Sequence, residues 1–332
     1  MVKCKNIKSG GMAVPPLKRR SSNRLLEHGE GGIILNTKKK HKWTKKSFVA
    51  YIFLAPWLLG LIGLTAVPMI SSFYYSFTNY DMLTSPRFIG VDNYVNLVAD
   101  PKFLKSLEVT LKFVFISVPL QLAFALLVAL MLKKNRTGAR VYRAVYYLPS
   151  LFGGSVAVAI LWRQLFNKEG LFNQILALFG IQGINWIATP KTALNTLIVL
   201  AIWQFGASMV IFLAALKQIP EDYYEAARID GAGHIKQFFY ITLPVLTPMV
   251  FFNIVMAFIN AFQSFTSAYV ISGGTGAPLN STLFYSLYLY IKAFSQFQMG
   301  YASAMAWILL AIIAAFTGLL FLSAKKWVFY DE

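Results

Sequence analysis

A cluster of acidic residues between two apolar segments is the most distinctive chemical feature of this 332-residue sequence. Four of its 13 carboxylates fall within residues 221–230. Pro220 suits the first turn of a helix, the two acidic residues after it complement the helix dipole, and Gly231 permits a left-handed stop. The spacing predicts a helix of about ten residues. Apolar residues at helical spacing predict a second segment over His234 to Leu243.

The first of these two segments has the surface expected of a docking element. Ala226 and Ala227 give it a face of small side chains, where a partner's backbone can approach closely, and Glu225 adds one fixed negative charge. From the residues alone, the competing interpretation is an ordinary amphipathic loop at a membrane surface. The two interpretations differ in whether a second protein covers the loop.

A second group of residues combines amides, hydroxyls and aromatic rings inside apolar segments. One segment carries a stripe at helical spacing, formed by Asn253, Asn260, Gln263, Ser264 and Ser267. A neighbouring segment places polar groups beside aromatic rings at Trp203, Gln204, Phe205 and Ser208. Amides and hydroxyls suit the hydroxyl groups of a sugar, and a ring suits its C–H face. The alternative is that these groups only join helices, at about 0.6 kcal/mol per hydrogen bond.

The apolar segments lack the groups that most enzymes and ion-coupled carriers need. None of the 13 carboxylates and none of the three histidines lies inside them, which disfavours acid–base chemistry, a metal site and an ion-coupled carrier. The glycines of residues 273–276 have no following lysine, so they do not form a phosphate-binding loop. We therefore expect no catalytic residue and no cofactor in this chain. Energy for uphill transport would come from another chain.

Composition places these segments in a membrane. The chain is 57% hydrophobic and only 13% charged, with a mean hydropathy of +0.56, whereas soluble proteins are roughly a quarter charged. Charge-free intervals predict an all-α, polytopic protein with six transmembrane helices. The six predicted spans are Ser47 to Tyr80, Phe113 to Leu132, Ala144 to Trp162, Thr192 to Leu216, about Leu243 to Ile271, and Ala293 to Ala324.

The positive charge of the chain follows this topology and does not indicate a nucleic-acid partner. The connectors on one side carry sixteen Lys and Arg residues, and those on the other side carry six. The positive-inside rule therefore places both termini in the cytoplasm. Residues 1–46 form a basic tail without apolar periodicity, which we expect to be disordered. Residues 327–332 form a short cytoplasmic end.

The acidic loop resembles the EAA motif of the permease subunits of binding-protein-dependent ABC importers. The matching residues are Glu225, Ala226, Ala227, Gly231, Ile241, Leu243 and Pro244. The adjoining residues are similar to the carbohydrate-importing branch, the MalF-type permeases, at Asp230, Ala232, Phe238 and Pro248. The resemblance extends over most of the chain after the basic tail.

The resemblance implies a type I ABC importer permease fold over residues 47–326, in a bacterial or archaeal inner membrane. Residues 217–243 would be the coupling loop that docks on a separate ATPase, which alone binds ATP and magnesium. The implied partners are two ATP-binding cassette subunits, a second homologous six-span permease, and an extracellular or periplasmic sugar-binding protein. Asn260, Gln263 and the region from Gln204 to Ser208 would contact the sugar, although Ser208 stands where the family has an aromatic residue.

The alternative function is a self-sufficient membrane channel or a scaffold. A channel would conduct in the absence of other proteins, and its filter would be sought in the glycine-rich residues 273–276. A permease subunit would move no solute alone. The two functions therefore predict opposite results for the isolated chain.

Overall fold

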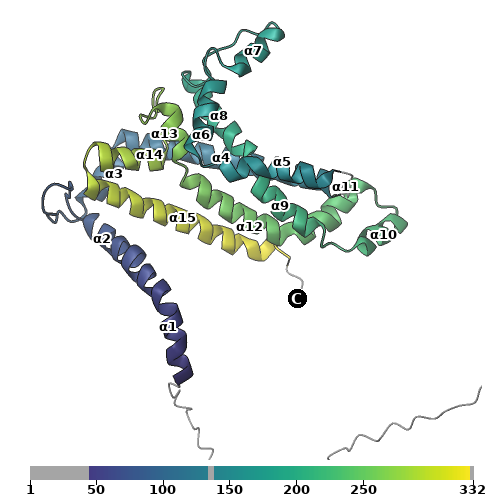
Figure 1. The fold of residues 1–332 in the computed structure, drawn as a ribbon, viewed down its shortest axis with the longest axis horizontal. Helices are drawn as coiled ribbons and strands as arrows, with labels where there is room; N and C mark the ends of the chain where they lie inside the picture. The colour runs from purple at the N-terminus through teal and green to yellow at the C-terminus, as the bar shows by residue number, and fades with distance from the viewer. Residues whose placement is uncertain (1–44, 134–137, 330–332) are drawn as a thin grey trace, which may run out of the picture. The chain divides into compact units, whose positions relative to one another are not determined.

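The computed structural model describes residues 45–133 and 138–329, and these residues are helical apart from connecting loops and one antiparallel bridge between Thr78 and Phe88 (Figure 1). The chain divides into two compact units, Met1–Pro56 and Trp57–Glu332. The expected disorder of residues 1–46 concerns a segment that lies almost entirely outside the described residues, as do residues 330–332 of the C-terminal end. The predicted all-α fold is confirmed.

The second unit contains most of the helices. After α1 (Lys45–Gly60) the elements are η1 (Leu61–Ala66), α2 (Val67–Tyr75), α3 (Asp92–Ala99), α4 (Pro101–Leu132), α5 (Ala139–Phe152), α6 (Val156–Leu165), α7 (Leu171–Leu178), α8 (Pro190–Trp203), α9 (Gly206–Leu216), α10 (Glu221–Ile229), α11 (His234–Gln237), η2 (Phe238–Thr242), α12 (Leu243–Phe262), α13 (Thr266–Ser272), α14 (Tyr285–Tyr290), η3 (Ile291–Ser295) and α15 (Met299–Trp327). The η elements are short π-helical turns.

Within the described residues, five helical segments are long and apolar enough to cross a membrane, or six if a bent pair forms one span. The five are Ile52–Tyr75, Pro101–Leu132, Pro190–Leu216, His234–Ser272 and Met299–Trp327. The bent pair is α5 and α6, whose axes differ by 101°. Gly153 and Gly154 occupy the bend, and Ser155 caps α6 by accepting a hydrogen bond from the backbone N–H of Val158 at 3.3 Å.

Several spans begin at different residues than the charge pattern predicts. The fifth begins at His234 and not near Leu243, because α11 and η2 continue into α12. The second starts at Pro101, before the expected Phe113, because the side chain of Asp100 caps α4 and the charged residues of its first turns project outward. The sixth starts at Met299 and not at Ala293. A π-helical turn and Phe297, with φ of +56°, interrupt the chain before it. Absence of charge therefore marks a span more reliably than it marks a helix end.

Helix α4 is the centre of the packing. It contacts α8, α9, α12 and α14, and its buried residues recur every three or four positions, as in a helix with one continuous inward face. Val114 and Ala125 on this face are fully buried. Helices α8, α9, α12 and α14 therefore pack with α4 into one bundle.

The two ends of α15 identify two opposite ends of the bundle. Its first residues contact α3. At its other end, α15 contacts the first half of α12. The backbone N–H of Phe329, just after α15, donates to Oγ1 of Thr247 on α12 at 3.0 Å, and the ring of Trp327 lies 6.0 Å from the ring of Phe251 on α12. A helix of 29 residues is roughly 43 Å long. The start of α12, which follows α10 and α11, is thus far from α3 (Figure 1).

Candidate functional site

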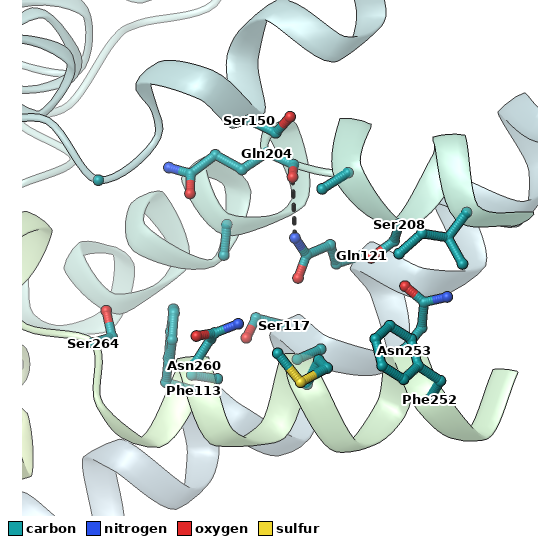
Figure 2. A pocket seen from close by; sticks show the side chains of 17 residues that line it. Phe113, Ser117, Gln121, Ser150, Gln204, Ser208, Phe252, Asn253, Asn260 and Ser264 are labelled. Atoms are coloured by element: carbon teal, nitrogen blue, oxygen red, sulfur yellow. Dashed lines mark hydrogen bonds between the residues drawn. The ribbon is translucent and has the colours of Figure 1, made fainter. Parts of the chain in front are cut away.

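A cavity of about 620 Å³, here called the central cavity, opens between α4, α5, α8, α9 and α12 (Figure 2). Its lining combines polar groups with apolar side chains, and none of these residues carries a formal charge. The lining residues are Phe113, Ser117, Gln121, Ser150, Gly154, Ala201, Gln204, Ala207, Ser208, Ile211, Phe252, Asn253, Met256, Ala257, Asn260, Ala261 and Ser264.

One wall of the central cavity is built where two helices break. The chain leaves helical geometry at Gln204, between α8 and α9, and at Gly153, between α5 and α6. Nε2 of Gln204 donates to the carbonyl oxygen of Gly153 at 2.9 Å, and Nε2 of Gln121 donates to the carbonyl oxygen of Gln204 at 3.2 Å. A Cβ atom on Gly153 would overlap the Gln204 side chain. Glycine at position 153 therefore leaves the space that the Gln204 side chain occupies.

The opposite wall is the polar stripe of α12. Asn253, Asn260 and Ser264 follow one another along this wall in Figure 2. Asn253 is 3% exposed, and its Nδ2 donates to the carbonyl oxygen of Met249 at 2.9 Å, whereas Asn260 is exposed to the cavity. Phe113 and Phe252 add aromatic surface. This mixture can bind a neutral molecule that presents both hydroxyl groups and C–H groups.

Four of the eight residues expected along a substrate pathway line this cavity: Gln204, Ser208, Asn260 and Ser264. The structure places the other four, Trp203, Phe205, Gln263 and Ser267, outside the lining. Gln263 and Ser267 follow the end of α12, where the helical periodicity that placed them on the stripe stops. Phe205 is buried against Phe124, and Trp203 stacks towards Trp162.

The sequence reasoning missed three polar residues of the central cavity. Ser117 and Gln121 lie one turn apart on α4, and Ser150 lies on α5. A signal was present, since polar residues four positions apart in an otherwise apolar segment share a helix face. Ser117, although only 1% exposed, and Gln121 make α4 a third polar wall of the central cavity.

The acidic loop forms the predicted pair of short helices, α10 and α11. Gly231 between them has a φ of +75°, as a left-handed stop requires. The N–H of Ala232 donates to the carbonyl oxygen of Ala227 at 2.8 Å, and Nε2 of Gln237 donates back to the carbonyl oxygen of Ala232 at 2.9 Å. The loop continues through η2 into Leu243 and Pro244 at the start of α12. The elbow is therefore held by hydrogen bonds on both sides.

Tyr224, which the sequence reasoning did not single out, anchors α10 to the bundle. Its side chain is buried, and its hydroxyl lies 2.9 Å from Oγ1 of Thr242 just before α12. Nζ of Lys133, after the end of α4, lies 4.0 Å from the centre of its ring. In contrast, Glu225, Ala226 and Asp230 are exposed. One face of α10 is thus fixed to the chain just after α4 and to η2 just before α12, and the other is open.

At the other end of the bundle, one carboxylate joins three elements. Oδ2 of Asp100 accepts hydrogen bonds from the hydroxyls of Tyr288 at 2.5 Å and Tyr301 at 2.8 Å, and Nζ of Lys292 lies 3.8 Å away. Partial burial raises the pKa of Asp100, but the hydrogen bonds from Tyr288, Tyr301 and the α4 backbone together outweigh it and lower the pKa below 3.8. Asp100 therefore remains ionised at neutral pH.

No group of three or more potential ligand residues that could hold a metal ion occurs among the residues that the structure describes. The central cavity offers amide and hydroxyl groups, the elbow offers an exposed acidic helix, and the Asp100 cluster offers a structural link.

A family model described as "Binding-protein-dependent transport system inner membrane component" matches residues 113–328. The chain is 50% identical over 297 residues to the probable ABC transporter permease protein YesP of Bacillus subtilis, a match that covers 89% of this chain and 96% of that protein. It is 32% identical to the lactose transport system permease protein LacF of Rhizobium radiobacter, covering 83% and 94%.

Two further comparisons extend this pattern. The chain is 30% identical to the trehalose/maltose transport system permease protein MalF of Thermococcus litoralis, over 85% of this chain and 95% of that one. Its fold is similar to a chain in the crystal structure of a bacterial alginate ABC transporter, with a TM-score of 0.74, 20% identity, and coverage of 85% and 96%. At that identity the structural likeness concerns the fold alone.

Proposed function

Because this chain belongs to the inner membrane components of binding-protein-dependent transport systems, and is thus a multi-pass permease subunit of an ABC importer, we propose that its cargo is a carbohydrate. Subunits of this family are not ATPases, so ATP and magnesium bind elsewhere in the assembly. The proposed assembly contains two ATP-binding cassette subunits, a second homologous permease and an extracellular or periplasmic sugar-binding protein. Both termini of this chain face the cytoplasm.

The observation that carries the carbohydrate proposal is the lining of the central cavity. Amide and hydroxyl groups from α4, α5, the α8–α9 break, α9 and α12 converge on a space of about 620 Å³ that also presents Phe113 and Phe252. A sugar matches this combination, because its hydroxyls need donors and acceptors and its ring face needs an apolar contact. Relatives named for lactose and for trehalose/maltose transport support the same cargo class.

The experiment that tests this proposal is reconstitution of the four-component importer in vesicles with a panel of neutral oligosaccharides. We expect at least one sugar to be taken up and to stimulate ATP hydrolysis. Asn260→Leu should slow uptake of that sugar severalfold, since it removes a polar group from the cavity wall. Gln263→Leu is the matched control, because Gln263 is exposed and lies outside the lining. Uptake of another solute class and of no sugar would contradict the proposal.

We further propose that residues 217–243 couple this subunit to the ATPase, with Glu225, Ala226, Ala227, Asp230, Gly231, Ala232, Leu243 and Pro244 forming the docking elbow. The exposed face of α10 and its fixed connection to α12 support this role. A charge that enters a desolvated cleft needs an opposite charge there, and removing one member of such a pair costs about 3 to 5 kcal/mol. Glu225 would meet a basic group of the ATPase.

Glu225→Ala and Gly231→Pro should therefore abolish ATP-driven uptake while the chain still inserts into the membrane. The readouts are co-purification with the ATPase and sugar uptake, and Glu221→Ala is a control on the same helix because its ion pair with Arg228 is exposed and 4.0 Å long. Normal uptake and normal ATPase association in both variants would exclude the coupling role. The carbohydrate proposal would be unaffected by that result.

A further inference from the structure

A second cavity lies at the α3 end of the bundle, far from α10. It has a volume of about 330 Å³ and is here called the rim pocket. Its walls come from the loop after α2, from α3, and from the connector and first turn of α15, and they include Asn79, Tyr80, Asp81, Asn96, Phe297 and Gln298. It shares no lining residue with the central cavity. It is therefore a separate site.

The walls of the rim pocket are held in place by buried contacts. Nδ2 of Asn93 donates to the carbonyl oxygens of Ser76 and Thr78, both at 2.8 Å, and this residue is only 6% exposed. The N–H of Gly300 donates to the carbonyl oxygen of Tyr80 at 2.9 Å, and a Cβ atom on Gly300 would overlap Thr78. The loop after α2 is thus fixed against both α3 and α15.

Several polar groups around the rim pocket keep binding capacity for a ligand. Oδ1 of Asp81 accepts hydrogen bonds from Leu83 and Thr84, and Oδ1 of Asn79 accepts one from the N–H of Arg87 at 3.2 Å. Oε1 of Gln298 accepts one from Lys292 at 3.2 Å. Within the described chain, no hydrogen bond occupies Oδ2 of Asp81, the side-chain Nδ2 of Asn79 or the side-chain Nε2 of Gln298. One acceptor and several donors therefore remain available.

Aromatic surface completes the rim pocket. Tyr80 is supported from behind by Tyr75, with ring centres 4.6 Å apart and planes 26° apart. Phe297 is 48% exposed and has a φ of +56°, a conformation that phenylalanine rarely adopts. Unusual backbone conformations of this kind cluster at functional sites. An exposed ring held in such a backbone, beside unfilled amides and a carboxylate, is a combination that binds sugars.

From these observations we infer that the rim pocket is a second carbohydrate site, which holds one sugar ring of the cargo before it reaches the central cavity. The inference rests on the proposed carbohydrate cargo. In the proposed topology the pocket faces the side from which the solute arrives, because α15 separates it from α10 by its whole length. Tyr301 lines the pocket and donates to Asp100, so the site borders the cluster that joins α4, α14 and α15.

The test is saturation-transfer NMR on the full chain with its partner permease in nanodiscs, using maltose, lactose and trehalose as probes. The Asn260→Leu/Gln204→Leu variant serves as the background, since it disables the central cavity and leaves the rim pocket intact. We expect at least one probe to receive saturation. Asn96→Ala should weaken its binding roughly fivefold, as expected for one lost hydrogen bond, and Phe297→Gly should weaken it by removing the aromatic contact. Glycine suits the positive φ, so the second variant removes the ring without added strain.

Phe294→Ala is the matched control, because Phe294 is an exposed phenylalanine on the same connector and does not line the rim pocket. Asn79→Ala is a further variant should Asn96→Ala lower the melting temperature. Equal saturation in all variants, or no saturation of any probe in this background, would overturn the inference. Weakened affinity for the sugar-binding protein with unchanged saturation would instead identify a protein-docking surface and also overturn it. Saturation that disappears only in the background variant supports the central cavity alone.

Discussion

Gly153 controls the position of the Gln204 side chain, and this single residue links the two helix breaks of the central cavity. We predict that Gly153→Ala displaces Gln204, because the added Cβ would overlap its side chain. The hydrogen bond from Gln204 to Gly153 would then be lost, at about 1 kcal/mol. Uptake by the reconstituted importer should fall severalfold, as in a Gln204→Ala variant.

Gly318→Ala is the control for this prediction, because Gly318 lies on α15 and does not line the central cavity. A Cβ atom at Gly318 would meet no other atom within 4 Å, so both the fold and uptake should remain close to those of the parent chain. Equal effects of the two substitutions would show that Gln204 is not the affected group. A Gly153→Ala/Gln204→Ala double variant should be no slower than either single variant, since both remove the same interaction.

At the residue scale, helical periodicity placed some polar residues correctly and misplaced others. Asn260 lines the central cavity as expected from its spacing, because α12 is regular up to Phe262. Ser264 lines the cavity although it follows the end of that helix, whereas Gln263 and Ser267, which also follow it, lie outside the lining. A break inside an apolar segment is not signalled by hydrophobicity alone, since no proline or glycine marks this one.

Helix α10 is attached to the bundle mainly through Tyr224, so this helix can transmit force to α12 only if that attachment is intact. We predict that Tyr224→Phe, which removes the hydroxyl that lies 2.9 Å from Oγ1 of Thr242, weakens the attachment by about 1 kcal/mol. ATP hydrolysis by the associated ATPase should continue, while sugar uptake per ATP falls. The measurement is the ratio of transported sugar to hydrolysed ATP in vesicles.

Tyr223→Phe is the matched control, because Tyr223 is the adjacent tyrosine and is 54% exposed. Its loss of a hydroxyl should leave the ratio unchanged. If Tyr224→Phe leaves the ratio unchanged as well, force reaches α12 by another route, such as the continuous chain through α11. Thr242→Val should reproduce the effect of Tyr224→Phe, since it removes the other partner of the same contact.

At the element scale, the short helices around Gly231 were predictable because local signals coincide there. Proline, acidic residues and a glycine mark the two ends of α10, and Gly231 adopts the left-handed conformation that this pattern requires. The anchoring role of Tyr224 was not predictable, since its partners Lys133 and Thr242 are distant in sequence or lie in a separate helix. The 101° bend between α5 and α6 was not predicted, because the adjacent Gly153 and Gly154 permit a bend without specifying its angle.

At the scale of the whole molecule, the Asp100 cluster fastens α4, α14 and α15 together at the end opposite α10. We predict that Asp100→Asn lowers the free energy of unfolding at neutral pH by about 2 kcal/mol, the typical value for hydrogen bonds to a charged group. The pKa of Asp100 in the folded protein is lowered below 3.8. Its stabilising contribution is therefore present above pH 3.8 and is lost as the pH falls through the folded pKa.

The measurement is the melting temperature of the solubilised chain from pH 3 to pH 8. The difference between the parent chain and Asp100→Asn should be constant above about pH 5 and should shrink at lower pH, as protonation makes the two side chains alike. Asp92→Asn on the neighbouring α3 is the control, because Asp92 is exposed. A difference that persists unchanged at pH 3 would assign the effect to the α4 cap and not to the charge.

The approximate places of the membrane spans were accessible from the sequence, because charge avoidance in a bilayer constrains every span in the same way, and the transporter family was accessible from the motif that begins at Glu225. The arrangement of the walls of the central cavity could not be predicted from the sequence. Gln204 forms hydrogen bonds with Gln121 on α4 and with Gly153 at the α5–α6 break. Such contacts depend on packing between segments that are distant in the sequence, and they have no local sequence signature.

The tether between the end of α15 and the start of α12 makes Trp327 a natural optical reporter. Its indole N–H donates to Oγ of Ser323 within α15 at 3.3 Å, and its ring lies 6.0 Å from that of Phe251 on α12, so the ring contact of the fluorophore reaches the segment that follows the coupling loop. In a chain whose six other tryptophans are replaced by phenylalanine, the intensity and wavelength of Trp327 fluorescence would report displacement of α12 during each cycle of ATP hydrolysis by the ATPase. Gating of the permease then becomes observable in real time without an attached dye.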